Sequence, residues 1–182
     1  MEAICTNKVG RFEAATSSQS NESTTDINNH PDTTVLGSNF LTVHDSEILV
    51  DVYGYNASDG SVKCPNISRD IKYDHPMSGK FYMLVRHKVI HCPRLANQLM
   101  CPMQIQISGV RINELPKFLV EDPDEKTHAI IVNDPLNPNK PLIIPLVLNG
   151  VTSYFPSRNP RSREYEDESI THIYMRSEAS VR

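Results

Sequence analysis

The hydrophobic positions of this sequence fall in short runs that alternate with polar residues, and turn-forming residues separate the runs. Residues 48–53 are rich in β-branched and aromatic side chains, and residues 80–90 carry apolar side chains at both odd and even positions. A run that is apolar on both faces is typical of a strand inside a sandwich or barrel. Because a turn segment containing Pro and Gly, residues 74–79, precedes the second run, we expect a hairpin there.

One segment, residues 95–106, has helical periodicity instead. Leu95, Leu99 and Met103 are spaced four residues apart, and this spacing places them on one face of a helix. Pro102 is expected to limit that helix to about two turns, because proline cannot donate the hydrogen bond that a helix interior requires. The sequence therefore predicts a single short helix.

The two ends of the chain differ in composition from its middle. Residues 1–25 are rich in Ser, Thr, Asn and Gln, and they predict a disordered polar tail. Residues 157–182 carry five arginines against five acids and predict a charged, solvated tail. Between the tails, further strand candidates lie at residues 129–132 and 142–148. We therefore expect one all-β domain over residues 26–156, built as a closed barrel or sandwich with one short helix and disordered tails.

Charge and apolar content exclude several classes of protein. The 182 residues include 18 Lys+Arg and 22 Asp+Glu, for a net charge of −4, without a basic stripe, so direct nucleic-acid binding is not expected. No run approaches the roughly 18 apolar residues of a transmembrane helix, and no membrane association is expected. The N-terminus has no apolar segment behind a basic start, which favours a cytoplasmic or nuclear protein over a secreted one. The four cysteines contain no Cys-x-x-Cys pair, and this suits reduced thiols.

Residues 28–37 read Asn-Asn-His-Pro-Asp-Thr-Thr-Val-Leu-Gly and carry the candidate chemistry. The segment resembles the active-site segment of retroviral-type aspartic proteases, whose pattern is Asp-Ser/Thr-Gly-Ala-Asp-(Ser/Thr/Asp)-Thr-Val/Cys-Leu/Ile. Asp32 and the threonine pair that begins at Thr33 match this pattern. His30 stands where the family has glycine, and Asn28 stands where it has the catalytic aspartate. The resemblance implies a retropepsin-like fold, with Asn28 and Asp32 at the catalytic segment and His30 and Thr33 in the binding site.

The resemblance continues downstream. Residues 89–100 are similar to the segment that follows the protease core in the polyproteins of copia-type retrotransposons, where an apolar pair, a proline and a leucine precede Asn-Leu-Leu-Ser. Shorter stretches resemble the same region in relatives from protists and fungi: residues 74–80, 99–104, 127–130 and 150–154. Together these motifs cover residues 26 to about 165, and they imply the protease region of a retrotransposon polyprotein.

In that family each chain supplies one aspartate, so the resemblance implies a homodimer that acts on a peptide or polyprotein substrate. The two carboxylates share a proton, and one activates a water while the other protonates the carbonyl oxygen. The amide of Asn28 does not titrate near neutral pH, and acid–base catalysis is worth about 10²–10⁴ per group, so we expect an inactive enzyme. We expect no cofactor. We expect no metal either, because His87, His91 and Cys92 offer only one set of close ligands.

Two other functions stay open from the sequence. An active aspartic endopeptidase is possible in principle if Asp32 or Asp26 supplies the carboxylate. Asp26 would share a strand face with Asn28, but it is displaced from it by about 6.6 Å along the strand. A non-catalytic module that binds peptides by strand addition, or that dimerises, needs neither carboxylate.

Overall fold

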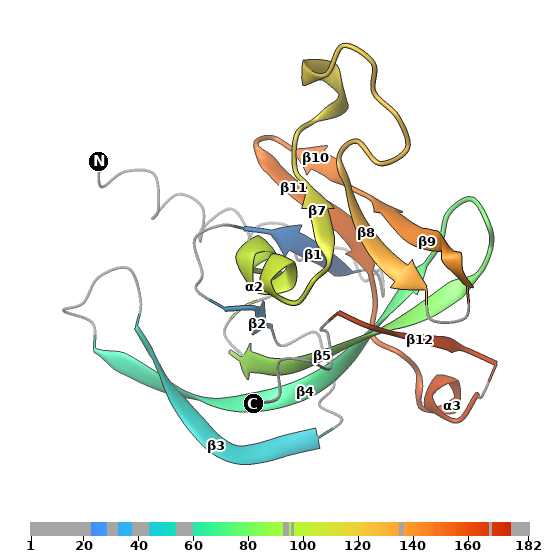
Figure 1. Ribbon diagram of the computed structural model, residues 1–182. Coiled ribbons are helices and arrows are strands. Elements are labelled where there is room, and N and C mark those ends of the chain that lie inside the picture. The colour runs from blue at the N-terminus through green and yellow to red at the C-terminus, as the bar shows by residue number, and fades with distance from the viewer. Residues whose placement is uncertain are drawn as a thin grey trace.

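The chain folds mainly into β-strands, as the computed structural model in Figure 1 shows. The structure describes residues 23–28, 33–37, 44–53, 60–92, 95, 97–134, 137–167 and 169–175. In chain order the elements are β1 (Ser23–Ile27), β2 (Val35–Leu36), β3 (His44–Tyr53), β4 (Ser61–Asp74), β5 (Phe81–His91), β6 (Gln98–Met100), α2 (Pro102–Ile107), β7 (Arg111–Asn113), the 3₁₀ turn η2 (Lys117–Leu119), β8 (Ala129–Asp134), β9 (Asn137–Pro145), β10 (Val147–Asn149), β11 (Thr152–Ser157), α3 (Ser162–Tyr165) and β12 (Thr171–Tyr174). The all-β class predicted from the sequence is confirmed.

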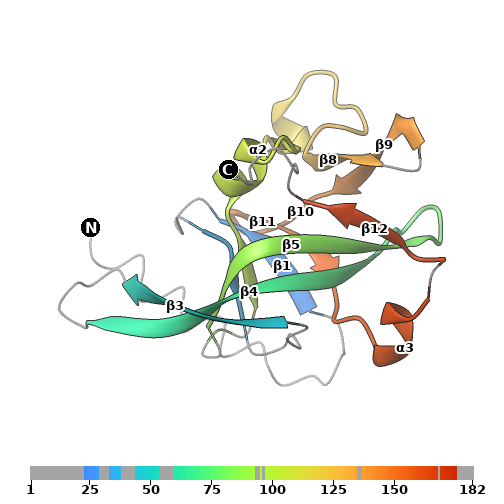
Figure 2. The ribbon, with the colours of Figure 1, turned by 60° about the horizontal axis from the view of Figure 1, so that its bottom comes forward.

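Most of the described strands belong to one nine-stranded sheet. Its order is β10-β11-β1-β6-β2-β5-β4-β3, and β12 pairs with β5 beside this path. A second sheet has the order β7-β8-β9. The long strands β3, β4 and β5 curve strongly in Figures 1 and 2, and the large sheet curls into a half-barrel. Over the described residues the large sheet of the predicted barrel or sandwich is thus a curled half-barrel, and the core side chains pack between it and the smaller sheet.

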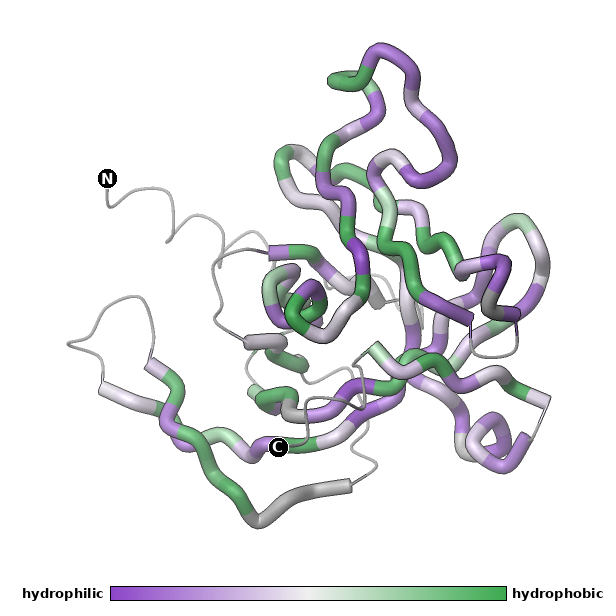
Figure 3. Tube along the Cα trace, viewed as in Figure 1, coloured by the Kyte–Doolittle hydropathy of each residue, from purple (hydrophilic) through white to green (hydrophobic). Residues whose placement is uncertain are grey.

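The hydrophobic core lies between the two sheets and α2. It contains Ile27, Ile71, Tyr73, Leu84, Met100, Ile105, Val110, Ile130, Val132, Leu142, Ile144, Leu146, Phe155, Ile173 and Met175. The rings of Tyr73 and Phe155 meet edge to face, with centroids 6.0 Å apart. Figure 3 shows the same division along the chain, since β8 and the second half of β9 carry hydrophobic runs, whereas the loop between β7 and β8 is largely hydrophilic. Because each large buried side chain contributes about 1.5–3 kcal/mol, this cluster holds the two sheets together.

The hairpin of β4 and β5 is the element that the sequence predicted best. Its strands pair antiparallel from Asp74 opposite Phe81 to Asn66 opposite Ile90, with one irregularity. Gly79 adopts a positive φ of 64°, which side chains with a Cβ rarely adopt. The hairpin prediction is confirmed.

The helix predicted at residues 95–106 is wrong in extent. Gln98–Met100 forms β6, and α2 begins only at Pro102 and ends at Ile107. Pro102 starts this helix rather than ending one, because the first helical position needs no N–H donor. The sequence predicted a single short helix, whereas the structure contains a second one, α3. In the described parts of the chain, neither helix has the length and apolar character that crossing a bilayer requires.

The charged segment 157–182 is not a solvated tail over the part that the structure describes. It contains α3 and β12, and β12 pairs parallel to β5. Ile170, Ile173 and Met175 are buried, although charged residues surround them in the sequence. The folded unit therefore includes residues to 175, and at the other end β1 already begins at Ser23.

Charged side chains attach α3 to β4. The Lys72 ammonium lies 2.6 Å from Oε1 of Glu164, and its side chain is only 4 % exposed. Arg158 donates to both oxygens of Glu164, at 3.0 and 2.9 Å, and its Nε donates to Asp74 at 2.9 Å. The Lys72 ammonium also lies 3.8 Å above the Phe81 ring. Both cations thus share Glu164, and they also share the more exposed Asp74, which lies 3.6 Å from the Lys72 ammonium.

Candidate active site

The segment around Asn28 joins two strands that lie on opposite sides of β6. β1 runs parallel to β6, with Ile27 beside Met100, and β2 runs antiparallel to β6, with Val35 beside Leu99. β6 is therefore the central strand of the three. The described residues of the candidate motif therefore lie on both sides of β6, with Asn28 directly after β1 and Val35 at the start of β2.

Two of the four predicted site residues are described. Asn28 is half-buried, and its backbone N–H donates to the Met100 carbonyl at 3.0 Å. Thr33 is half-buried as well. His30 and Asp32 lie outside the described residues. The structure therefore fixes where position 28 lies, directly after β1 and beside the end of β6.

Thr34 fixes the second half of the motif, where the chain enters β2. The sequence did not reveal this role. The backbone N–H of Thr34 donates to Oε1 of Gln104 at 2.8 Å, and its hydroxyl accepts from the Cys101 N–H at 3.3 Å. The Ile90 N–H donates to the Thr34 carbonyl at 3.1 Å. The buried Thr34 thus connects α2 and β5 to the start of β2. Nothing in the sequence distinguishes Thr33 from Thr34, because only the strand register decides which hydroxyl points inward.

Gly37 lies where two backbone segments come very close together. A Cβ at this position would be 2.2 Å from the Leu95 carbonyl oxygen and 2.7 Å from that of Asn97. The motif thus ends at a residue that has to be glycine, since these neighbours are backbone atoms and cannot rotate away. A glycine after two apolar residues is the sequence signal that indicates such a contact.

Asp26 is a buried carboxyl two residues before Asn28. It is 5 % exposed, and on β1 it lies between Leu99 of β6 and Tyr154 of β11. Burial raises the pKa of Asp26 above its ordinary value, and hydrogen bonds from Thr24 and Asn97 oppose that shift only partly. The Thr24 hydroxyl donates to Oδ1 at 3.2 Å, whereas Oδ2 has no hydrogen-bond partner among the described residues. Burial thus raises the pKa of Asp26 above that of an exposed aspartate, and the missing partner at Oδ2 leaves the charged form less well compensated.

These groups can do different chemistry. The Asn28 amide can donate and accept hydrogen bonds, but it cannot take up or release a proton near neutral pH. The Asp26 carboxyl can titrate, but strands on both sides enclose it. At position 28 the arrangement is therefore able to bind a polar group and unable to act as a general base.

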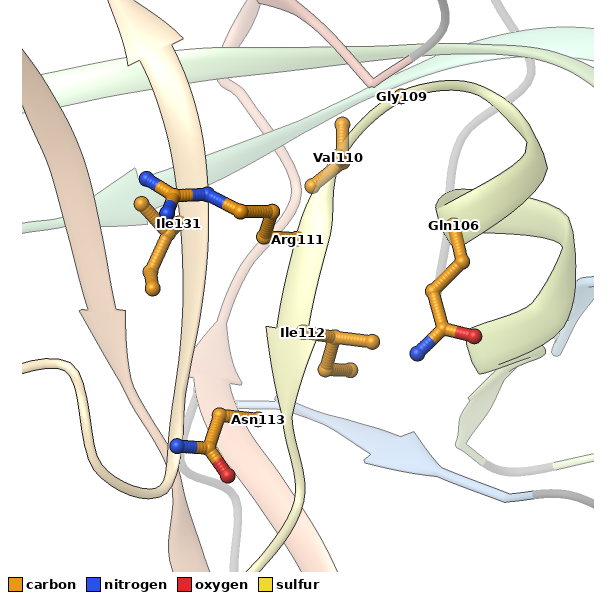
Figure 4. Close-up of a pocket in the computed structure, with 7 residues that line it drawn as sticks. All are labelled: Gln106, Gly109, Val110, Arg111, Ile112, Asn113 and Ile131. Carbon is orange, nitrogen blue, oxygen red and sulfur yellow. The ribbon is translucent and has the colours of Figure 1, made fainter.

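A separate hollow of about 430 Å³ lies between the end of α2 and β7. In Figure 4 the side chains of Gln106 and Ile112 point toward each other, while Arg111 extends toward β8. Ile131 of β8 also lines the hollow, and no residue of β1 or β2 does. Among the described residues, helix α2 connects the hollow to the motif. Gln104 of α2 accepts a hydrogen bond from Thr34, and Gln106 of the same helix lines the hollow.

The structure offers no arrangement for a metal among the residues that it describes. No group of three or more His, Cys, Asp or Glu side chains is placed to hold one there. No disulfide joins Cys64, Cys92 and Cys101, the cysteines that the structure describes.

Comparisons with known proteins give no relative for this chain. No family model matches the sequence, and neither a curated protein nor a solved structure matches it. A function therefore has to be argued from the motif and from the geometry described above.

Proposed function

We propose that this chain is a catalytically degenerate aspartic-protease-like domain derived from a copia-type retrotransposon polyprotein, with Asn28 in place of the catalytic aspartate. The observation that carries this proposal is the meeting of the two motif segments in space. Val35 and Leu36, from the first segment, pair with Ile90 and His91, and Val35 also pairs with Leu99, all from the second. A resemblance spread over distant parts of a sequence gains support when those parts lie side by side.

The chemistry of position 28 sets the limits of this function. A homodimer would bring two Asn28 amides together, where the proteases that the motif resembles have two carboxylates sharing a proton. Amides can hydrogen-bond to a peptide but cannot activate water. The domain would therefore bind an extended peptide or polyprotein segment without cutting it, in the cytoplasm or the nucleus.

The test is to restore the missing acid. Asn28→Asp is expected to introduce peptide cleavage in a chain that otherwise shows none, with a gain of about 10² or more over the wild type. Purified wild type, Asn28→Asp and Asn28→Ala are compared on a peptide panel between pH 3 and pH 7, with and without a transition-state mimic of aspartic proteases.

Asn28→Ala is the matched control, because it changes the same side chain without supplying an acid. It should stay inactive. The proposal is wrong if the wild type already cleaves the panel and the mimic blocks that cleavage.

The same assay tests the alternative that this chain is an active endopeptidase whose carboxyl comes from a residue other than position 28. The raised pKa of Asp26 and the unpartnered Oδ2 are features that catalytic acids often show. In that case Asp26→Asn or Asp32→Asn would abolish an activity that Asn28→Ala leaves intact. The 5 % exposure of Asp26 speaks against this function, because a catalytic acid has to reach the substrate.

A non-catalytic module is the second alternative, and the edge of the large sheet favours it. β3 ends the strand order and, among the described residues, pairs only with β4. Ile48, Leu49 and Tyr53 are exposed on it. An extended peptide could add to this edge through backbone hydrogen bonds. Leu49→Lys on β3 should then weaken peptide binding measured by fluorescence anisotropy, whereas Val151→Lys, at an exposed apolar residue outside β3, should not. Equal binding by both variants and the wild type would contradict this function.

A further inference from the structure

The loop that joins β7 to β8 carries three large apolar side chains into solvent. Leu115 is 50 % exposed, Phe118 is 76 % exposed and Leu119 is 61 % exposed. In Figures 1 and 2 this loop, which contains the 3₁₀ turn η2, stands out from the body of the fold. The three side chains are not part of the hydrophobic core between the two sheets. Packing within the domain therefore does not explain them, and a cluster of exposed apolar side chains is typical of an interaction surface.

Hydrogen bonds fix the N-terminal end of this loop. The Asn113 side chain accepts from the Leu115 N–H at 3.3 Å and donates to the Lys126 carbonyl at 3.3 Å, so it ties the two ends of the loop together. Within η2 the Leu119 N–H donates to the Pro116 carbonyl at 3.0 Å. The turn that presents the apolar side chains is therefore held in one conformation.

The C-terminal end of the loop is anchored as well. The Thr127 hydroxyl donates to the Asp124 carboxylate at 2.9 Å. The His128 carbonyl accepts from the Leu146 N–H at 2.8 Å, and the His128 ring Nε2 is hydrogen-bonded to the Ser153 hydroxyl of β11 at 2.8 Å. These two contacts hold His128 at a positive φ of 56°, which residues other than glycine rarely adopt. A loop that is ordered at both ends loses little conformational entropy when a partner binds it.

Acidic side chains accompany the apolar ones. Residues 114–126 contain five acids and two lysines, so the loop has an excess of negative charge. Glu121, Asp122 and Glu125 are exposed, and no ion pair within the described part of the chain involves them. A surface that complements this loop is therefore apolar where it meets the exposed hydrophobic side chains and basic around them.

We propose that residues 114–126 form a docking loop for another protein, whose binding surface is apolar at its centre and bordered by lysines or arginines. Phe118 and Leu119 are the anchors, because large side chains that become buried at the centre of an interface carry most of the binding energy. The carboxylates increase the association rate and select basic partners. This role does not depend on the chemistry of position 28.

Charge argues against two other occupants of the docking loop. A second copy of this chain carries the same acidic loop and a net charge of −4, so two copies repel each other. The surface of a cytoplasmic membrane leaflet is negative too, and it repels the carboxylates of the loop. A basic protein surface is the occupant that both the apolar and the charged side chains fit.

The probe for this proposal is a synthetic amphipathic helix with a face of leucines bordered by lysines. A second peptide has glutamate in place of every lysine. Fluorescence anisotropy with the full chain at pH 7 and low salt is expected to show about tenfold tighter binding of the lysine peptide, and the difference should shrink as sodium chloride is added. Equal affinity for the two peptides, or no binding of either, would overturn the proposal.

Two pairs of variants locate the contact. Phe118→Ser combined with Leu119→Ser should weaken binding of the lysine peptide about tenfold, whereas Val151→Ser, at an exposed apolar residue between β10 and β11, should not. Glu121→Lys should weaken binding, whereas Glu166→Lys, which changes the net charge equally but lies outside the docking loop, should leave it nearly unchanged. The proposal is refuted if the anchor variant binds like the wild type or if the two members of either pair behave alike.

Two further measurements distinguish the occupants. In sedimentation velocity, self-association of the wild type that the double serine variant of Phe118 and Leu119 abolishes would show that a second copy covers the loop. Binding to phosphatidylcholine vesicles that the same variant abolishes would assign the loop to a lipid surface. Either result contradicts the proposal. The thermal unfolding midpoint of the variant should equal that of the wild type, because both side chains are exposed.

Discussion

Gly37→Ala is expected to lower the free energy of unfolding by about 3 kcal/mol, at the upper end of the cost of overpacking. The added Cβ would lie 2.2 Å from the Leu95 carbonyl oxygen and 2.7 Å from that of Asn97. Both neighbours are backbone atoms, so relief requires β2 to move away from the segment that leads into β6. Urea denaturation of the wild type and the variant measures the difference.

A second glycine provides the control for this substitution. Gly79 has a φ of 64°, and a Cβ there would meet no atom within 4 Å. Gly79→Ala therefore pays only for the left-handed backbone, about 1–2 kcal/mol. If both variants lose the same stability, the close approach at Gly37 is not what limits that position. Gly37→Ala in the Asn28→Asp background should also remove the restored activity, because the motif is displaced.

Glu164→Gln is expected to cost about 2–4 kcal/mol of stability at pH 7. The substitution keeps the size of the side chain and removes the charge that Lys72 and Arg158 share. The side chain of Lys72 is 4 % exposed, and a buried cation that loses its partner is strongly destabilising. Asp74, at 3.6 Å from the Lys72 ammonium, compensates in part. Asp74→Asn is the control, and because Asp74 is 55 % exposed its loss should cost less than about 1 kcal/mol.

The same carboxylate makes the stability depend on pH. Hydrogen bonds from Arg158, above all, hold the pKa of Glu164 well below the ordinary 4.5. A depressed pKa in the folded state stabilises the protein above the unfolded value and loses that effect as the pH falls. The difference between wild type and Glu164→Gln should therefore be constant from pH 7 to about pH 5.5 and shrink steadily below pH 4.5. A difference that grows with acid would contradict the assignment.

Local sequence signals predicted the strands that form with near neighbours. The hairpin of β4 and β5 has its turn, its glycine and its apolar residues within one continuous stretch, so it was predicted correctly. The prediction missed β6, because the spacing of Leu95, Leu99 and Met103 is that of a helix. Pairing with β1, some 70 residues earlier, makes this segment a strand. The prediction also missed β12, because charged residues outnumber the apolar ones in that segment. Ile170, Ile173 and Met175 are buried because β12 packs beside β5.

The candidate site was predictable at the level of the motif and not at the level of contacts. The sequence singled out Asn28 and Thr33, and the structure places Asn28 at the exit from β1. The contacts of Thr34 with Gln104 and Cys101 depend on how α2 docks, which no local pattern encodes. The burial of Asp26 likewise follows from its position between β6 and β11. The roles of these residues arise from tertiary structure.

The position of β1 between β6 and β11 has a consequence for synthesis of the chain. β1 is translated well before its two partner strands, Gln98–Met100 and Thr152–Ser157. At about 5–20 residues per second, many seconds pass on the ribosome before both edges of β1 find their partners. During that interval the nascent chain presents an unpaired strand, and unpaired strand edges invite pairing between molecules. Aggregation of this protein is therefore expected to depend more on the rate of translation and on chaperones than on the stability of the finished fold.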